Sequence, residues 1–308
     1  MKSSRKSSVK KTRVTPITLD SHGYFTRNGE RVIPVGVNYW PGSSGVEMWA
    51  RWPEDEIKRD LDLVASLGFN CVRFFLRWQD FEPQPGKYNK KAFEQLAQFI
   101  EWCGQRKILA HPSLFVGFMS GGVFWPQWRE GRNVFSDPFM LERAESFAAH
   151  AAKTIAPLSE FLLAIDQGNE LCCLRDSYDA PPAAVSNWCA VISAAIREAC
   201  PRVLIVSGNE QNQIVNDGGW RLGQQKGTDF YSMHGYPVPG WHSQGFDGMT
   251  DALGQSLLPL YTRIARTYGP VMVQELGTIA TFGAAQQDAY LRAILPGCWD
   301  AGANGFLW

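Results

Sequence analysis

Short apolar segments alternate with longer amphipathic segments along almost the whole chain. The apolar segments are rich in Val, Ile, Leu and Phe, which is typical of strands buried on both faces of a parallel sheet. Eight strands are predicted, at residues 32–39, 70–76, 108–112, 161–167, 203–207, 230–234, 271–275 and 305–308.

The segments between these strands carry helix signals. After Pro53, an acidic first turn is followed by apolar residues at helical spacing, and Gly68 lies just past the last of them. This order predicts an amphipathic helix. Further helices are predicted at residues 93–103, 138–156, 183–199, 253–267 and 286–301, and a Gly-rich, weakly helical stretch follows the fifth strand.

The alternation of strand and helix predicts one (β/α)₈ barrel over residues 16–308. The alternative is an open doubly wound sheet, which would need a glycine-rich phosphate loop after its first strand. The sequence at that place, residues 35–40, is VGVNYW. An Asn28-Gly29 turn between short alternating segments also predicts a β-hairpin, which we expect at the N-terminal end of the barrel.

Both ends of the sequence differ from a regular barrel. Residues 1–15 are rich in Lys and Arg and contain no apolar stretch, so we expect a disordered basic tail that is not a secretory signal, and a cytoplasmic protein. The eighth strand ends at Trp308, whereas a complete barrel continues into an eighth helix. We therefore expect the sequence to be truncated there.

Composition excludes some partners. The 308 residues are 45% hydrophobic and 19% charged with zero formal net charge, so no overall field attracts nucleic acid or an anionic membrane. No apolar run reaches the length of a membrane span. The seven cysteines are spaced unlike a disulfide framework or a zinc site and are expected to be reduced, mostly buried thiols. No cofactor and no metal site are predicted.

Polar residues stand where the predicted strands end, which is where barrel enzymes keep their catalytic groups. In strand order they are Arg73, His111, Asn169, Glu170, His234, Tyr236, Glu275 and Trp308. Glu170 and Glu275 follow strands on opposite sides of the ring, and barrel dimensions leave about 6 Å between their carboxyl groups. Hydrolysis of a glycosidic bond needs such a pair, and this separation is nearer the retaining than the inverting range.

This set of residues resembles family 5 of the glycoside hydrolases, a family of retaining barrel enzymes that includes cellulases and β-mannanases. The resemblance extends from the hairpin to Trp308. It implies that Glu275 is the nucleophile of a double displacement, that Glu170 is the acid and then the base, and that Asn169 binds the sugar 2-hydroxyl.

The same resemblance implies roles for the surrounding groups. Arg73 and Tyr236 would keep the nucleophile ionised. His111 and His234 would orient carboxyl groups or sugar hydroxyls, and Trp308 would form the floor beneath the sugar at the cleavage point.

Tryptophans in loop-like contexts suggest stacking platforms for sugar rings. The candidates are Trp40, Trp125, Trp128 and Trp241. The opening GVNYWP and the long loop at residues 115–137 resemble a bacterial branch of family 5 associated with β-mannosides. The partner is therefore expected to be a β-linked oligosaccharide or polysaccharide.

Three functions remain open at this point. The first is a retaining hydrolase of β-1,4-linked mannosides, either a β-mannosidase or an endo-β-mannanase. The others are an endo-β-1,4-glucanase on the same scaffold and a non-catalytic carbohydrate-binding barrel. Among the other acids, Asp166 is expected to be a buried structural carboxylate, Glu82 to lie at the surface, and Glu210 to line the cleft without a catalytic role.

Overall fold

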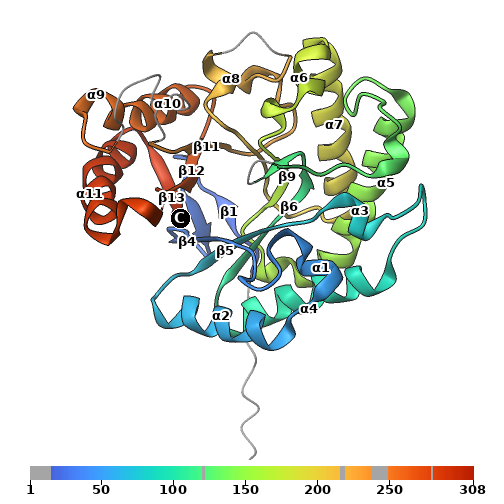
Figure 1. Cartoon of the computed structure of the whole chain (residues 1–308), viewed down its shortest axis with the longest axis horizontal. Coiled ribbons are helices and arrows are strands. Elements are labelled where there is room, and N and C mark those ends of the chain that lie inside the picture. The colour runs from blue at the N-terminus through green and yellow to red at the C-terminus, as the bar shows by residue number, and fades with distance from the viewer. Residues whose placement is uncertain (1–14, 120–121, 216–218, 238–248, 279) are drawn as a thin grey trace, which may run out of the picture.

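Eight parallel strands form the centre of the molecule, and helices surround them (Figure 1). The computed structural model describes residues 15–119, 122–215, 219–237, 249–278 and 280–308. The barrel strands are β4 (Val35–Tyr39), β5 (Cys71–Phe75), β6 (Leu109–Val116), β9 (Ile165–Asn169), β10 (Ile205–Gly208), β11 (Tyr231–Gly235), β12 (Val271–Leu276) and β13 (Ala303–Leu307). All eight predicted strands are confirmed in type and order.

The sheet closes on itself and forms the predicted barrel. Its hydrogen-bonded order is β10-β9-β6-β5-β4-β13-β12-β11. The ring closes between β10 and β11, where the His234 backbone N–H donates to the Asn209 carbonyl over 2.7 Å. The Asn209 N–H in turn donates to the Ser232 hydroxyl over 3.0 Å. The C-terminal ends of all eight strands therefore meet around one rim.

The helices follow the predicted alternation. They are α1 (Met48–Arg51), α2 (Glu54–Ser66), α3 (Trp78–Phe81), α4 (Lys90–Gln105), α5 (Pro138–Ile155), α6 (Arg175–Asp179), α7 (Pro182–Ala199), α8 (Asn212–Val215), α9 (Ala252–Gln255), α10 (Leu257–Arg266) and α11 (Ala284–Asp300). The side chains of Asn89 and Asp137 cap the first turns of α4 and α5, as N-cap residues do. Among the helices of the described ranges, none is long and apolar enough to cross a membrane.

One predicted helix, at residues 253–267, is divided into α9 and α10. Pro259 lies in the first turn of α10 and has no N–H with which to reach the Gln255 carbonyl. Asp251 caps the N-terminus of α9, and a second helix begins at Leu257. The division is therefore a local effect of proline.

The N-terminal hairpin closes one end of the barrel. Strands β2 (Phe25–Arg27) and β3 (Glu30–Arg31) flank the Asn28-Gly29 turn, and β1 (Thr18–Leu19) pairs with β2. The Phe25 side chain is fully buried and meets the ring of Phe230 edge-on at 5.0 Å. It belongs to one apolar cluster with residues at the N-terminal ends of the barrel strands. The predicted hairpin and its position are confirmed.

Replacing Phe25 with alanine should lower the free energy of unfolding by about 3–5 kcal/mol, because a fully buried ring is lost from the closed end of the barrel. Urea unfolding monitored by circular dichroism measures this. Phe139→Ala, which removes a ring that is 37% exposed, is the matched control and should cost less than about 1 kcal/mol. Equal losses in both variants would contradict the role of Phe25.

Candidate active site

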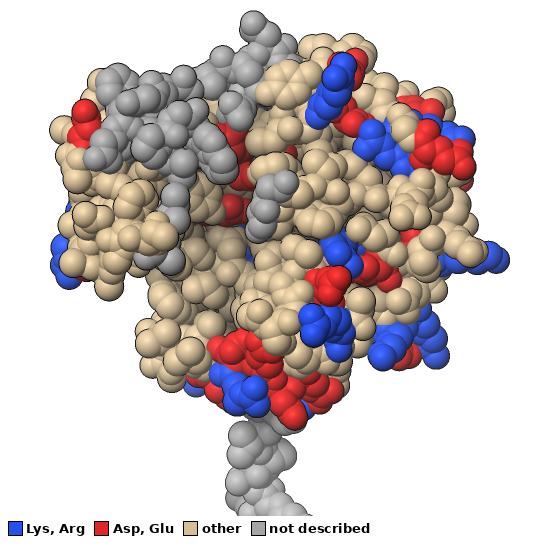
Figure 2. Space-filling model, in the orientation of Figure 1, with Lys and Arg blue, Asp and Glu red and all other residues tan. Residues whose placement is uncertain are grey.

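The two predicted carboxyl groups face each other across the barrel rim. Glu170 directly follows β9, and Glu275 lies within β12. One oxygen of each carboxyl and one ring nitrogen of His234 all lie within 4.8 Å of one another. The exposed fraction is 8% for Glu170 and 7% for Glu275, so both side chains are buried. Figure 2 shows acidic side chains inside a hollow near the middle of one face of the molecule.

A strained backbone position holds Glu170 at the rim. Its φ of 46° and ψ of 42° lie in the left-handed region. Residues other than glycine seldom adopt this conformation, because it costs them free energy. The Glu170 N–H is bonded to the Gly208 carbonyl over 3.0 Å. Gly168 lets the chain approach β6, since a Cβ there would lie 2.6 Å from the Phe115 carbonyl oxygen. The turn after β9 is therefore shaped around this side chain.

Glu275 is surrounded by donors that favour its ionised form. Arg73 Nη1 donates to Oε1 over 2.6 Å, and the Tyr236 hydroxyl donates to Oε2 over 2.7 Å. Burial acts to raise the pKa of Glu275, but the charges of His234 and Arg73 and the Tyr236 hydrogen bond outweigh it, and the pKa is lowered. The group is thus a carboxylate available to act as a nucleophile.

Glu170 lies in a different electrostatic environment. Burial, and then the negative charge of Glu275, raise its pKa above the ordinary value. Its Oε1 is 2.9 Å from Nδ1 of His234. A raised pKa favours the protonated carboxyl, which can act as a general acid, whereas the lowered pKa of Glu275 favours its carboxylate.

A chain of hydrogen bonds sets the proton on His234. The Ala164 carbonyl can only accept, so His111 Nδ1 donates to it over 3.0 Å. Burial lowers the pKa of His111 to about 4, so the ring is neutral and its Nε2 accepts from Gln274 over 2.7 Å. Gln274 Oε1 then accepts from His234 Nε2 over 3.1 Å. His234 Nδ1 is left to share one proton with Glu170.

Arg73 is held rigidly beneath Glu275. Its guanidinium is fully buried, and Nε and Nη2 donate to Asp166 Oδ2 over 3.0 and 2.7 Å. It also donates to Asn38 Oδ1 over 3.0 Å and to Asn169 Oδ1 over 2.7 Å. The position of the arginine is therefore fixed by four neighbours, Glu275 included.

Asp166 is the buried structural carboxylate that the sequence suggests. Besides Arg73, it accepts from the backbone N–H groups of Gly168 and Gly208 over 3.0 and 2.9 Å. It thereby joins β9, β10 and the guanidinium in one network.

The remaining rim residues lie at the predicted strand ends. Asn169 is 1% exposed, and its Nδ2 donates to the Phe118 carbonyl over 2.6 Å. Trp308 follows β13, is 39% exposed, and is anchored by its backbone, whose N–H donates to Gly36 over 2.8 Å and whose carbonyl accepts from Asn38 over 2.7 Å. The structure thus brings Asn169 into the carboxyl network and leaves the Trp308 ring accessible.

The candidate stacking tryptophans occupy different environments. Trp40 is partly buried and stacks on Phe75 at 5.4 Å. Trp125 and Trp128 both meet the ring of Trp78 edge-on, at 6.1 and 5.2 Å. The Trp128 indole N–H also donates to the Glu82 carbonyl over 2.9 Å, which fits a packing contact. Trp241 lies outside the described residues.

Glu82 corrects an expectation, because it is fully buried instead of lying at the surface. It accepts from the Trp78 indole over 2.7 Å and the Gly86 N–H over 2.6 Å, and lies 3.6 Å from Arg143. A charged residue in a turn normally faces water, but here the carboxylate satisfies buried donors. Glu210 is also buried, at 2% exposure.

Gln274 and Asn38 are members of the network that the sequence reasoning missed. Gln274 connects the two histidines, and Asn38 connects Arg73 to β12 through its Nδ2, which donates to the Gln274 carbonyl over 3.0 Å. A glutamine next to Glu275 in the strand VMVQEL, whose other residues are apolar, was the available signal for Gln274. The signal for Asn38 is similar, since it is a polar residue in the strand VGVNY.

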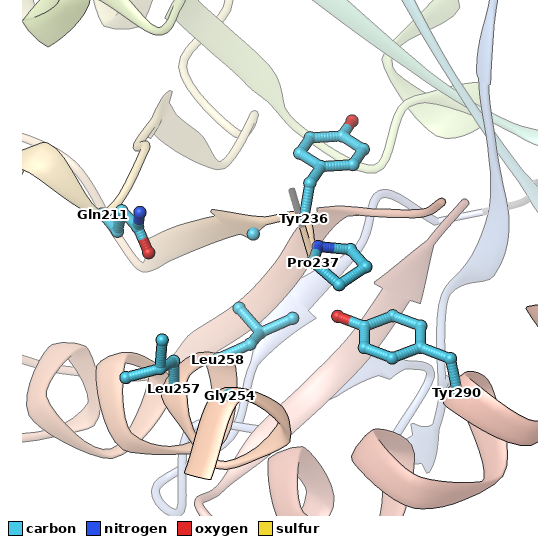
Figure 3. A pocket seen from close by; sticks show the side chains of 8 residues that line it. Gln211, Tyr236, Pro237, Gly254, Leu257, Leu258 and Tyr290 are labelled. Carbon is cyan, nitrogen blue, oxygen red and sulfur yellow. The ribbon is translucent and has the colours of Figure 1, made fainter. Parts of the chain in front are cut away.

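A pocket next to the site lies behind Tyr236. It is lined by Gln211, Gly235, Tyr236, Pro237, Gly254, Leu257, Leu258 and Tyr290. In Figure 3 the Tyr236 ring points away from the other lining side chains, and its hydroxyl is the one that binds Glu275. Tyr236 thus belongs both to the lining of this pocket and to the carboxyl network.

A parallel (β/α)₈ barrel with two buried, opposed carboxyl groups at its C-terminal rim has the architecture of the barrel glycoside hydrolases. The family model described as Cellulase (glycosyl hydrolase family 5) matches residues 27–304. The chain belongs to this family.

Solved structures and a curated sequence are also similar to this chain. An exo-β-1,4-mannosidase, Op5Man5 from Opitutaceae bacterium strain TAV5, is 52% identical with a TM-score of 0.92, over 94% of this chain and 54% of that chain. A GH5_18 protein from Streptomyces cattleya, in complex with Manb1-4GlcNAc, is 22% identical with a TM-score of 0.82, over 90% of this chain and 70% of that chain. The latter likeness shows the fold alone.

A curated β-galactosidase from Aspergillus niger is 30% identical over 146 residues, which are 46% of this chain and 14% of that protein. The chain thus spans about half of the mannosidase structure and a small part of the fungal relative.

Asp166→Asn should lower the free energy of unfolding by about 3–5 kcal/mol, because it leaves the buried Arg73 charge with one carboxylate fewer. Thermal and urea unfolding measure the loss. Asp62→Asn, which breaks the exposed ion pair with Arg106, is the matched control and should leave stability nearly unchanged. Wild-type stability in Asp166→Asn would contradict the structural role of this aspartate.

Proposed function

We propose that the chain hydrolyses β-1,4-linked mannosides with retention of configuration, with Glu275 as nucleophile and Glu170 as acid and base. The observation that carries this proposal is the pair itself: two carboxyl groups whose oxygens approach within 4.8 Å, one with a lowered and one with a raised pKa. Since one oxygen of each carboxyl lies within 4.8 Å of the other, the pair is nearer the retaining separation of about 5–5.5 Å than the inverting range of about 6.5–9.5 Å.

The first step is glycosylation of the enzyme. A Glu275 carboxylate oxygen attacks the anomeric carbon while the bond to the leaving oxygen breaks, and Glu170 gives its proton to that oxygen. Arg73 and Tyr236 hold the attacking carboxylate in one orientation. His234 is placed to share the proton of Glu170 as charge develops.

The second step releases the sugar. Glu170, now a carboxylate, takes a proton from water while the water oxygen attacks the anomeric carbon and the bond to Glu275 breaks. Its pKa rises again when Glu275 regains its negative charge, because that charge is the second cause of the raised pKa. The site thereby returns to its starting proton state.

The mannoside preference is supported by the exo-β-1,4-mannosidase at 52% identity, which covers 94% of this chain. The family model carries the description Cellulase, and this favours β-1,4-glucan as the second candidate substrate. Relative rates on mannobiose, mannan and carboxymethylcellulose distinguish these, and release of single mannose units from one end distinguishes an exo from an endo enzyme.

Glu275→Ala should lower kcat on an aryl β-mannoside by at least about 10⁴-fold, because no covalent intermediate can form. Glu170→Ala should lower kcat on mannobiose by about 10²–10⁴-fold. With an activated aryl leaving group, azide should restore turnover of Glu170→Ala and give a β-mannosyl azide, identified by NMR. Glu198→Ala, at an exposed position of α7, is the control and should keep wild-type rates.

These variants also separate the alternatives. Full activity of Glu275→Ala or Glu170→Ala without azide would exclude the assigned roles. A wild-type protein that binds mannobiose but never cleaves it would instead be a carbohydrate-binding barrel. An α-configured first product, seen by NMR during hydrolysis, would mean an inverting mechanism.

Tyr236→Phe should move the acid limb of the kcat/KM profile to higher pH by about one unit. The variant removes a donor to the Glu275 carboxylate, so the pKa of Glu275 rises, and a hydrogen bond to a charged group is worth about 1.5 kcal/mol, near one pKa unit. Activity requires ionised Glu275 and is lost below its pKa. Tyr231→Phe, in the strand that ends just before Tyr236, is the control and should leave the profile unchanged; an unshifted acid limb in Tyr236→Phe would contradict the role of the hydroxyl.

A further inference from the structure

Two adjacent thiols and a carboxylate lie beside Glu170 and take no part in the proposed mechanism. Cys172 and Cys173 belong to the short 3-10 helix η4 (Leu171–Cys173), which starts directly after Glu170. Their sulfur atoms are 3.9 Å apart, and Cys173 Sγ lies 3.7 Å from Glu210 Oε2. Glu210 follows β10, so the cluster connects the ends of two neighbouring strands.

We propose that Cys172, Cys173 and Glu210 form a binding site for a soft divalent cation such as Zn²⁺ or Cd²⁺. In a tetrahedral zinc site, Zn–S bonds of about 2.3 Å and Zn–O bonds of about 2.0–2.2 Å require sulfur atoms about 3.8 Å apart and sulfur–oxygen distances of about 3.5 Å. The observed sulfur–sulfur distance of 3.9 Å and the distance of 3.7 Å from Cys173 Sγ to Glu210 Oε2 agree with these values within a few tenths of an ångström. One ligand atom from each residue lies within 4.8 Å of the other two.

A disulfide between the two cysteines is the other chemistry that such a pair suggests, and the geometry disfavours it. Adjacent residues joined by a trans peptide have Cα atoms about 3.8 Å apart, below the range of about 4.4–6.8 Å that disulfides prefer. Cation binding needs no change in that spacing.

Access and proton balance are compatible with a cation. Cys172 is almost fully buried, whereas Cys173 is partly exposed, so an ion can enter from the side of Cys173. The hydrogen bond with Cys172 and then burial raise the pKa of the Cys173 thiol. Each cation bound by both thiolates must therefore release two protons, and affinity should rise with pH. Three protein ligands leave a fourth position for water.

A cation in this site would act on Glu170. The Cys173 N–H donates to the Glu170 carbonyl over 2.9 Å, and the charges of Glu170 and Glu210 both bear on Cys173. The two thiolates balance the two charges of the cation, so the effect on Glu170 is one of position: ligation ties η4, which begins directly after Glu170, to Glu210 and holds the Glu170 turn in one arrangement. We therefore expect inhibition, seen as a lower kcat. This consequence rests on the proposed function, whereas binding itself does not.

Cd²⁺ is the direct probe, because thiolate–cadmium bonds give an ultraviolet charge-transfer band. Titration of the wild-type chain should give this band with a stoichiometry near one, and release of about two protons per ion should be detected with a pH indicator. Cys173→Ser should give a weaker band, from the Cys172 thiolate alone, and bind Cd²⁺ at least about 10-fold more weakly; Glu210→Gln should keep the full band with reduced affinity. Cys200→Ser, a buried cysteine at the end of α7, is the matched control and should bind like wild type.

The second cluster within the described residues, Glu170, His234 and Glu275, is the competing cation site, and it contains no thiol. Binding and inhibition that persist unchanged in Cys173→Ser, or Cd²⁺ binding without a charge-transfer band, would overturn the proposal. Circular dichroism melting of each variant separates loss of the site from loss of the fold. Inhibition is compared with the cation-free rate of the same variant, and an inactive wild-type protein that still shows the band would refute only the proposed function.

Discussion

The geometry of the barrel interior depends on one guanidinium that has no contact with water. An unpaired charge at the position of Arg73 would cost many kcal/mol, so its neighbours must neutralise it and fill its donor positions. Asp166 and Glu275 supply the two negative charges, and Asn38 and Asn169 accept further hydrogen bonds. The orientation of the carboxylate at the rim is therefore a consequence of satisfying the arginine below it.

The same arrangement explains why the pKa values of two nearby carboxyl groups are shifted in opposite directions. Only Glu275 is bonded to the guanidinium, whereas Glu170, on the other side of the rim, shares its proton with His234. The neutral His111 and Gln274 fix the far nitrogen of His234 as a donor. Two like side chains thus acquire unlike chemistry from the strands that present them.

Much of the fold and of the rim could be predicted from the sequence, because both follow from repeating rules. Runs of apolar residues define buried strands, and parallel strands in a barrel bring their C-terminal ends together, so Arg73, Glu170 and Glu275 could be placed at one rim before any coordinates. The division of residues 253–267 by Pro259 concerns a local hydrogen bond that helical periodicity does not register.

The hydrogen-bond relay could not be predicted for a comparable reason. Strand alternation would turn Gln274 away from the side that Glu275 faces. The register of β11 against β12 shifts at this place: Met233 pairs with Val273, the next residue, His234, pairs with Glu275, and Gln274 has no partner in this register. Such a bulge changes the direction in which side chains point. Glu82 was misplaced because its burial depends on donors from Trp78 and Gly86, and these meet it only after folding.

The apolar cluster at the N-terminal end of the barrel determines from which side small molecules can approach the site. Among the described residues, Phe25 and its neighbours fill that end with buried apolar side chains. In the proposed hydrolysis, substrate, leaving group and the attacking water therefore all approach from the rim where the carboxyl groups lie. The departing half of the sugar would then have to leave the space that the water occupies next.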